Sequence, residues 1–375
     1  MQWSAGVQHQ LSTNLTLNVQ YVGTRGVQIP FTVGANGFQT VCPGCYSPWP
    51  TDPPDQRLAG VTQYLQGANS HYNALQTTVN KRFSHGLDFQ FNYTWSHCLD
   101  TISNGGIFGF GNPGNALNAI PGDLRRNYGP CDYDYRHAFN GFYTYALPMH
   151  ARSRFLNQAI GGWEISGSVI YHGGQPFSIG TPTSTANGGS LINTSGPVYP
   201  NLITGQPLYA KTPVGSDCIN NPSNCVTQPG NLQWLNPNSF LAVVDSTTGL
   251  CVPATSDISA AIAGEDITPA LCQRGDMQRN FLRGPAFGWS DLFLTKRFKL
   301  TERVTFLVSG QAYNFLNHPN FKSPGGDAGI PGQIGTLTGF GNISSTASPP
   351  TGLLGSFLGG DTAPRMIALK GQIQF

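Results

Sequence analysis

The chain has 375 residues, of which only 10% are charged, and its formal net charge is +2. A typical globular domain is about 25% charged, so a soluble protein of this composition would have few charges to solvate its surface, whereas a β-barrel in lipid needs few. The small net charge argues against nucleic-acid binding, and no apolar run approaches the roughly 20 residues of a transmembrane helix.

Apolar and polar residues alternate along several segments, and this alternation predicts β-strands. The first two such segments, residues 2–10 and 15–23, flank a short turn. The next two, residues 72–83 and 87–98, flank a tight turn at residues 84–86. In residues 87–98 large apolar side chains alternate with polar ones, as expected of a strand between lipid and a polar lumen. The large residues are Leu87, Phe89, Phe91, Tyr93 and Trp95.

The same alternation returns through the rest of the chain. The further strands are residues 135–147, 163–171, 289–298, 303–316 and 365–375. Each is close to the roughly 9–11 residues with which a barrel strand crosses a bilayer obliquely. The sequence therefore predicts an all-β fold, an antiparallel transmembrane β-barrel portion with about nine strands.

The connections between these segments fall into two classes. Short ones lie near residues 11–14, 84–86, 148–160 and 299–302, and long ones rich in Gly, Pro, Asn and Ser lie near residues 24–71, 99–132, 173–287 and 317–364. Bacterial outer-membrane barrels have short periplasmic turns and long extracellular loops. A soluble β-sandwich gives no reason for such sorting, so the pattern favours the barrel.

An odd number of strands raises a question of closure. Single-chain bacterial barrels have an even number of strands, and this chain would begin at the outer side and finish in the periplasm at Phe375. Residues 1–6 also lack the features of a secretory signal. We therefore expect residues 1–375 to be part of a barrel whose N-terminal strands, plug and signal peptide lie outside them.

Residues 279–321 resemble a late barrel hairpin of TonB-dependent outer-membrane receptors of the Oar-like group. They contain an RGP segment, the basic-aromatic KRF, then TERV and a closing AYNFLNHPNF. Three more stretches are similar to other hairpins of that group, so the resemblance covers nearly the whole chain. These are YNALQTTVNKRF (72–83), YRHAFNGFYTYALP (135–148) and GGWEISGSVIYHGGQPFSI (161–179).

The resemblance implies a 22-strand barrel with a plug, which imports an unidentified ligand or, in some Oar-like members, assists export. It implies no enzymatic activity and no cofactor. The implied partners are outer-membrane lipid, the barrel-assembly machinery, the transported ligand and, only through a plug, the TonB system. The implied location is the outer membrane of a Gram-negative bacterium. The last strand resembles the signal that the assembly machinery reads, on residues Ile367, Leu369, Ile373 and Phe375.

Polar residues opposite the apolar ones are the candidates for contact with a plug or a transported ligand, although simple hydration of the lumen explains them more readily. They are Asp88, Gln90, Asn92, Thr94, Ser309 and Gln311. Residues 179–200, rich in Ser, Thr, Asn and Gly, suit either a polar-ligand site or a solvated loop.

Eight cysteines fall on the side of the long loops. An oxidising periplasm favours disulfides, and we expect the pairs Cys98–Cys131, Cys218–Cys225 and Cys251–Cys272, with Cys42 and Cys45 bonded locally. The alternative for Cys42 and Cys45 is a redox or zinc motif, but a second pair of ligands is missing. No histidine has the spacing of a metal site, and we predict no metal.

Two other functions compete with the transport receptor. One is a surface-exposed binding or adhesion protein on a small outer-membrane barrel, with residues 173–287 as its binding loop. The other is a secreted, lectin-like β-sandwich, against which the uncharged face from Leu87 to Trp95 argues.

Overall fold

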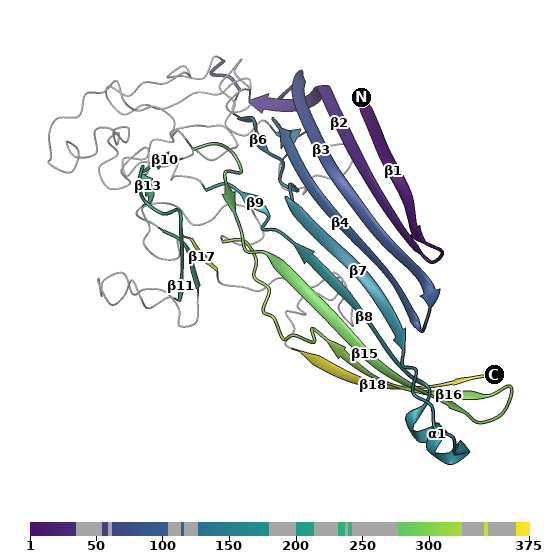
Figure 1. Cartoon of the computed structure of the whole chain (residues 1–375). Coiled ribbons are helices and arrows are strands. Elements are labelled where there is room, and N and C mark those ends of the chain that lie inside the picture. Colours follow the sequence, from purple (N-terminus) through teal and green to yellow (C-terminus); the bar gives the residue numbers. More distant parts are fainter. Residues whose placement is uncertain are drawn as a thin grey trace.

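The computed structural model describes residues 1–34, 55–58, 62–103, 114–115, 127–179, 200–213, 232–236, 239–241, 277–324, 341–343 and 365–375. Its main feature is one antiparallel sheet whose principal path has nine long strands (Figure 1). They follow one another as β1 (Gln2–Ser12), β2 (Leu15–Gly34), β3 (Thr62–Ser84), β4 (Leu87–Asp100), β7 (His137–Ala146), β8 (Trp163–His172), β15 (Phe287–Lys299), β16 (Thr305–Tyr313) and β18 (Met366–Gln374). All nine predicted strands are confirmed, and neighbours in this sheet follow one another along the chain.

The turn between β3 and β4 shows how local sequence sets the register. Ser84 pairs with Leu87, so only His85 and Gly86 connect the strands, and both have positive φ angles, 52° and 80°. Two successive residues with positive φ make the two-residue hairpin turn whose twist matches that of the strands. Gly at the second position adopts this conformation without strain.

The register gives the sheet one polar face and one apolar face. On the polar face, Asn92 of β4 lies between Thr78 of β3 and Asn140 of β7. On the apolar face, Phe91 lies opposite Val79. Paired residues of antiparallel strands point to the same side, and the register carries this division, with few exceptions, from β1 to β18.

Aromatic side chains cover glycines on the apolar face. Trp3 lies over its partner Gly23, and Phe91 lies over its partner Gly141. A Cβ atom at either glycine would lie 2.2 Å from the ring. These glycines therefore leave room for the rings to lie across the neighbouring strand.

Two of the predicted connections differ from the structure. Residues 24–71 do not form one long loop, because β2 continues to Gly34 and β3 begins at Thr62. The pairing passes a shift in register between Gly26 and Pro30, where Gln28 has a φ of 55°. This irregularity interrupts the alternation of apolar and polar residues in the sequence. The alternation therefore does not predict the parts of β2 and β3 that lie beyond it.

The predicted short turn at residues 148–160 contains a helix, α1 (Arg154–Ile160). It follows β7 at the end of the sheet where the short turns lie (Figure 1). A helix of seven residues is too short to show a helical period in the sequence. The described part of the chain holds no helix with the length and hydropathy needed to span a membrane.

Short strands gather at the opposite end, within the segments predicted as long loops (Figure 1). They are β5 (Gly114–Asn115), β6 (Gly129–Pro130), β9 (Pro176–Phe177), β10 (Asn201–Leu202), β11 (Tyr209–Pro213), β12 (Leu232–Leu235), β13 (Phe240–Leu241), β14 (Leu282–Arg283) and β17 (Asn342–Ile343). Buried apolar side chains make a small core among them, namely Phe177, Ile179, Leu235, Phe240, Met277 and Leu282. The end of the sheet with the long connections therefore carries packed structure of its own.

Candidate functional site

The predicted lumen residues of β4 share the polar face and form part of a hydrogen-bonded ladder. The hydroxyl of Thr78 donates to Asn92 Oδ1 at 3.0 Å, and Asn92 Nδ2 donates to Asn140 Oδ1 at 3.0 Å. Gln90 Nε2 also approaches Asn92 Oδ1, at 3.4 Å. Asp88 and Thr94 lie on the same face by register. The ladder ties the polar side chains of β3, β4 and β7 together.

Ser309 and Gln311 lie on the same polar face but on β16, and β7, β8 and β15 separate them from β4. Ser309 accepts a hydrogen bond from Thr295 at 3.0 Å, and Gln311 accepts one from the Tyr313 hydroxyl at 3.1 Å. The six predicted residues therefore line one face in two groups and do not converge on one point.

Exposure follows the same division in the outer half of β4. Tyr93 and Trp95, on the apolar face, are 38% and 56% exposed, whereas Ser96, Cys98 and Asp100, on the polar face, are buried. An uncovered aromatic face and a covered polar face are the reverse of a soluble sheet, and they match a strand between lipid and protein interior.

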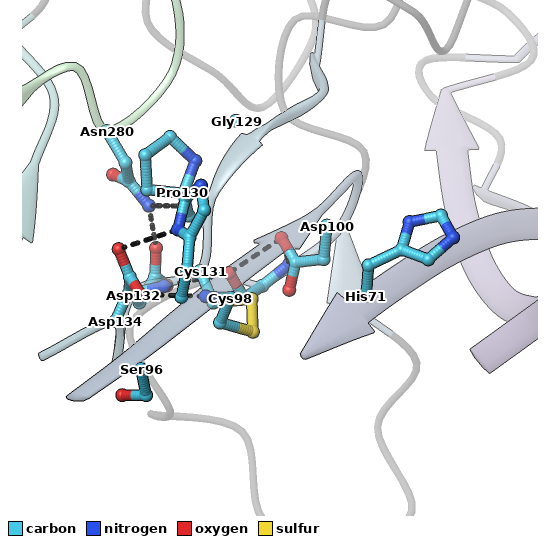
Figure 2. Close-up of a disulfide and its surroundings, with 12 residues drawn as sticks. His71, Ser96, Cys98, Asp100, Gly129, Pro130, Cys131, Asp132, Asp134 and Asn280 are labelled. Atoms are coloured by element: carbon cyan, nitrogen blue, oxygen red, sulfur yellow. Dashed lines mark hydrogen bonds and ion pairs between the residues drawn. A yellow bond between two sulfur atoms is a disulfide. The ribbon is translucent and has the colours of Figure 1, made fainter. Parts of the chain in front are cut away.

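The polar face ends in a disulfide at the end of β4 (Figure 2). Cys98 and Cys131 are bonded, with Cα atoms 5.4 Å apart, which confirms the predicted pair. The N–H of Cys131 donates to the Cys98 carbonyl at 3.1 Å, and β6 pairs with the residues that follow Cys98. The bond fixes the chain before β7 against the end of β4. The other predicted cysteines, Cys42, Cys45, Cys218, Cys225, Cys251 and Cys272, lie outside the described residues.

A group of charged and polar side chains, most of them buried, surrounds this disulfide, and we call it the mouth cluster. It consists of Asp100, Asp132, Asp134, Arg279, Asn280 and Arg283. Three carboxylates here face the guanidinium groups of Arg279, Arg283 and the neighbouring Arg136, so the charges balance.

Arg279 is the most enclosed cation of the mouth cluster, with 3% of its surface exposed. Its Nη2 pairs with the Asp100 carboxylate and donates to the Asp100 carbonyl at 2.7 Å. Its Nε donates to the Asn127 carbonyl at 2.8 Å, and its Nη1 donates to the Ser103 hydroxyl at 2.9 Å. One side chain therefore joins the two ends of the connection between β4 and β7 to the connection that precedes β15.

Asp134 is the corresponding buried anion. It accepts the N–H of Cys98 at 2.7 Å and the Nε of Arg136 at 3.1 Å, and it pairs with Arg283. Burial by itself raises the pKa of the Asp134 carboxyl, but the hydrogen bonds from Arg283 and Cys98 and the two positive charges outweigh it, so the pKa lies below its ordinary value.

Asp132 behaves differently. Burial is the largest influence and raises the pKa of its carboxyl, although the Asn280 side chain donates to it and Arg279 lies 3.7 Å away. Asn280 Nδ2 also donates to the Pro130 carbonyl at 2.8 Å (Figure 2). Asn280 has a φ of 55°, a conformation that Asn tolerates better than most residues.

This arrangement holds structure in place, although the Oδ2 atom of Asp132 is buried without a hydrogen-bond partner. Its carboxylates are engaged by guanidinium groups or amides, and the described residues include no group of His, Cys, Asp and Glu suited to a metal ion. What the mouth cluster does is clamp residues 127–136 and 277–284 onto the outer end of β4.

Sequence patterns did not point to the mouth cluster. Arg279 and Arg283 lie inside the stretch that carries the family resemblance, and Asp132 and Asp134 lie beside a predicted cysteine. The signal available in the sequence was the charge of these residues. Because this chain has few charged residues, one in a loop is expected to have a partner of opposite charge.

Comparison with known proteins gives the family. A family model described as an outer membrane beta barrel domain matches residues 1–357, and no curated protein matches the sequence. Over its whole length the chain is similar to part of the outer membrane transporter YddB from Escherichia coli, with 7% identity, a TM-score of 0.40 and 32% of that protein covered. It is also similar to part of the siderophore receptor PiuA from Acinetobacter baumannii, with 8% identity, a TM-score of 0.33 and 35% covered.

The chain thus spans 32% of the length of YddB and 35% of that of PiuA. Barrels of the matched family lie in the outer membrane of Gram-negative bacteria, and the apolar face of the sheet suits lipid. Given a family match over residues 1–357 and a sheet whose nine long strands have one apolar and one polar face, the chain belongs to the outer membrane β-barrel domain family.

Proposed function

We propose that the chain forms part of the barrel of a TonB-dependent transport receptor. The observation that carries the proposal is the polar face, which continues across all nine strands and offers amide and hydroxyl groups but few charges. A polar, weakly charged wall suits a lumen that holds a plug and passes a solute. Asp88, Gln90, Asn92, Thr94, Ser309 and Gln311 are the side chains we assign to that wall.

The two outer strands support a larger barrel. β1 and β18 end the sheet, and both run from the end with the long connections to the end with the short turns. Direct closure between them would be parallel, whereas outer-membrane barrels are antiparallel throughout. We propose that an odd number of further strands, as in a 22-strand barrel, lies between them.

The last strand is proposed as the signal for barrel assembly. Ile367, Leu369 and Ile373 point to the apolar face by their pairing with β16, and they are exposed together with Phe375. Alternating apolar residues on a terminal strand give the assembly machinery a uniform edge and face to bind. The partner that energises transport, TonB, would act only through a plug.

A surface-exposed binding or adhesion protein is the second candidate. The observation that favours it is the small core at the end with the long connections, where Trp234 Nε1 donates to the Arg283 carbonyl at 2.9 Å. A packed loop region is a suitable binding surface with or without transport. The secreted β-sandwich is disfavoured by the family match.

Growth on nutrient-limited media distinguishes the two candidate functions. A strain lacking this gene, a complemented strain and a strain lacking TonB would be compared on media that each limit one nutrient, such as chelated iron, cobalamin or an oligosaccharide. A receptor for uptake predicts that the first and third strains fail on the same medium. An adhesion protein predicts normal growth on every medium and weaker attachment to surfaces. Accumulation of a compound inside the deletion strain would indicate export instead.

A further inference from the structure

Helix α1 presents an apolar face that no described part of the chain covers. Phe155 is 81% exposed, Leu156 is 55% exposed and Ile160 is 44% exposed. At 100° per residue these three side chains and Ala159 fall on one side of the helix, and Asn157 and Gln158 fall on the other. So small a helix with so large an uncovered apolar area needs a partner.

The structure fixes the end of α1 on the apolar side of the sheet. Lys296 of β15 lies on the apolar face, because its register partners are Val308 and Trp163. Its ammonium group donates to the Ala159 carbonyl at 3.1 Å and also to the Gly161 carbonyl. Trp163 Nε1 donates to the same Ala159 carbonyl at 3.2 Å.

These hydrogen bonds explain why a cation is buried on the apolar face of the sheet. Lys296 is 3% exposed and lies 5.4 Å from the centre of the Trp163 ring. The last carbonyls of a helix have no partners within the helix, and a cation there satisfies them. Lys296 therefore holds α1 beside the apolar face, at the end with the short turns (Figure 1).

The charged side chains within the α1 segment are positive, and Glu164, the first acidic residue after it, pairs with Arg297 at 2.7 Å. Residues 148–163 contain Arg152, Arg154 and His150 and no acidic residue, and Arg152 is exposed. Short turns of outer-membrane barrels are periplasmic, so we expect this basic segment near the phospholipid headgroups of the periplasmic leaflet. Anionic headgroups attract such segments.

We propose that α1 is an in-plane membrane anchor, which inserts Phe155, Leu156 and Ile160 into the periplasmic leaflet and directs its polar side to the headgroups. The occupant of the exposed helix face is phospholipid, because Lys296 holds the helix end beside the apolar face of β15 and because Arg152 and Arg154 of the same segment complement anionic headgroups. The proposal rests on the membrane location of the family and is independent of transport.

Fluorescence quenching in vesicles tests this placement. The native protein, with any further barrel strands that it carries, would be reconstituted in vesicles of phosphatidylethanolamine and phosphatidylglycerol, with a fluorescent amino acid in place of Phe155 in one variant and of Gln158 in the matched control. Brominated acyl chains should quench the probe at Phe155 several-fold more than the probe at Gln158, and aqueous iodide should show the reverse order.

A third variant, with the probe at Leu294 on the apolar face, identifies preparations in which the sheet is inserted, and only these are scored. Equal quenching by iodide at Phe155 and Gln158 would overturn the proposal, because the helix would then lie in water. Protection of Phe155 from both quenchers would also overturn it, because protein and not lipid would then cover the face.

Discussion

Arg279 shows how one residue can hold together the connection that precedes β15 and the connection between β4 and β7. It is buried against Asp100 and donates to the carbonyl groups of Asn127 and Asp100. Removal of one partner from a buried pair leaves the other charge uncompensated, which is costlier than the pair itself is favourable.

Arg279→Met is therefore expected to lower the free energy of unfolding by about 3–5 kcal/mol. Urea unfolding of the protein folded in vesicles measures the change. Arg57→Ala is the matched control, since Arg57 pairs with Asp55 at the surface and should leave the unfolding midpoint unchanged. Equal midpoints for both variants would mean that Arg279 does not clamp the mouth.

Asp134 gives the mouth cluster a dependence on pH. Its pKa in the folded protein is below the ordinary value, so it binds a proton more weakly than in the unfolded chain. The stabilisation is fully present above the unfolded pKa of about 4 and is lost as the pH falls through the folded pKa.

Asp134→Asn should be clearly less stable than the wild-type protein at neutral pH, and the difference should shrink as the pH falls below the ordinary carboxyl range. Unfolding by urea at a series of pH values measures this convergence. A difference that stays constant down to strongly acidic pH would show that the charge of Asp134 contributes nothing.

At the level of elements, the β15–β16 hairpin has an apolar face that disfavours charged side chains and a polar face that tolerates them. Leu294, near the middle of β15, points to the apolar face, and Gln311 of β16 points to the polar face. An arginine in lipid near the middle of the membrane costs about 2–4 kcal/mol, whereas a lumen position tolerates charge.

Leu294→Arg should accordingly lower the free energy of unfolding in vesicles by about 2–4 kcal/mol, and Gln311→Arg should leave it nearly unchanged. Both variants add one arginine to the same hairpin, so charge and size are matched. The assignment of faces would be wrong if Gln311→Arg were the more damaging substitution.

For the whole molecule, the two outer strands of the sheet lead us to expect further strands in the native protein. β1 and β18 each have one neighbour in the sheet, and exposed strand edges invite pairing with other strands. Our proposal of further strands from the same polypeptide predicts a native protein much larger than the 40.2 kDa of this chain.

An antibody raised against residues 289–316 would test this on outer membranes of the source organism. We expect one heat-modifiable band that is well above the mass of the chain. A heat-modifiable band at the mass of the chain alone would instead favour the small barrel of an adhesion protein.

The sequence alone determined the strands and their faces. Alternation is a property of adjacent residues, so Leu87 to Trp95 and Ile367 to Phe375 revealed their strands without knowledge of any partner. Sorting of short and long connections gave the topology, and the positions of Cys98 and Cys131 at the two ends of one loop gave their disulfide.

The tertiary structure alone decided the mouth cluster, the outer parts of β2 and β3, and the position of α1. Arg279 and Asp100 are 179 residues apart, and no local pattern links two charges across such a distance. Lys296 in the sequence is a charge in a strand meant for lipid, and only the fold shows that it binds the carbonyls of α1. The face of a strand on which a side chain lies depends on residues that are adjacent in the sequence. The contacts of Arg279 and Lys296 depend instead on which strands pair and on where the chain between the strands folds back onto the sheet.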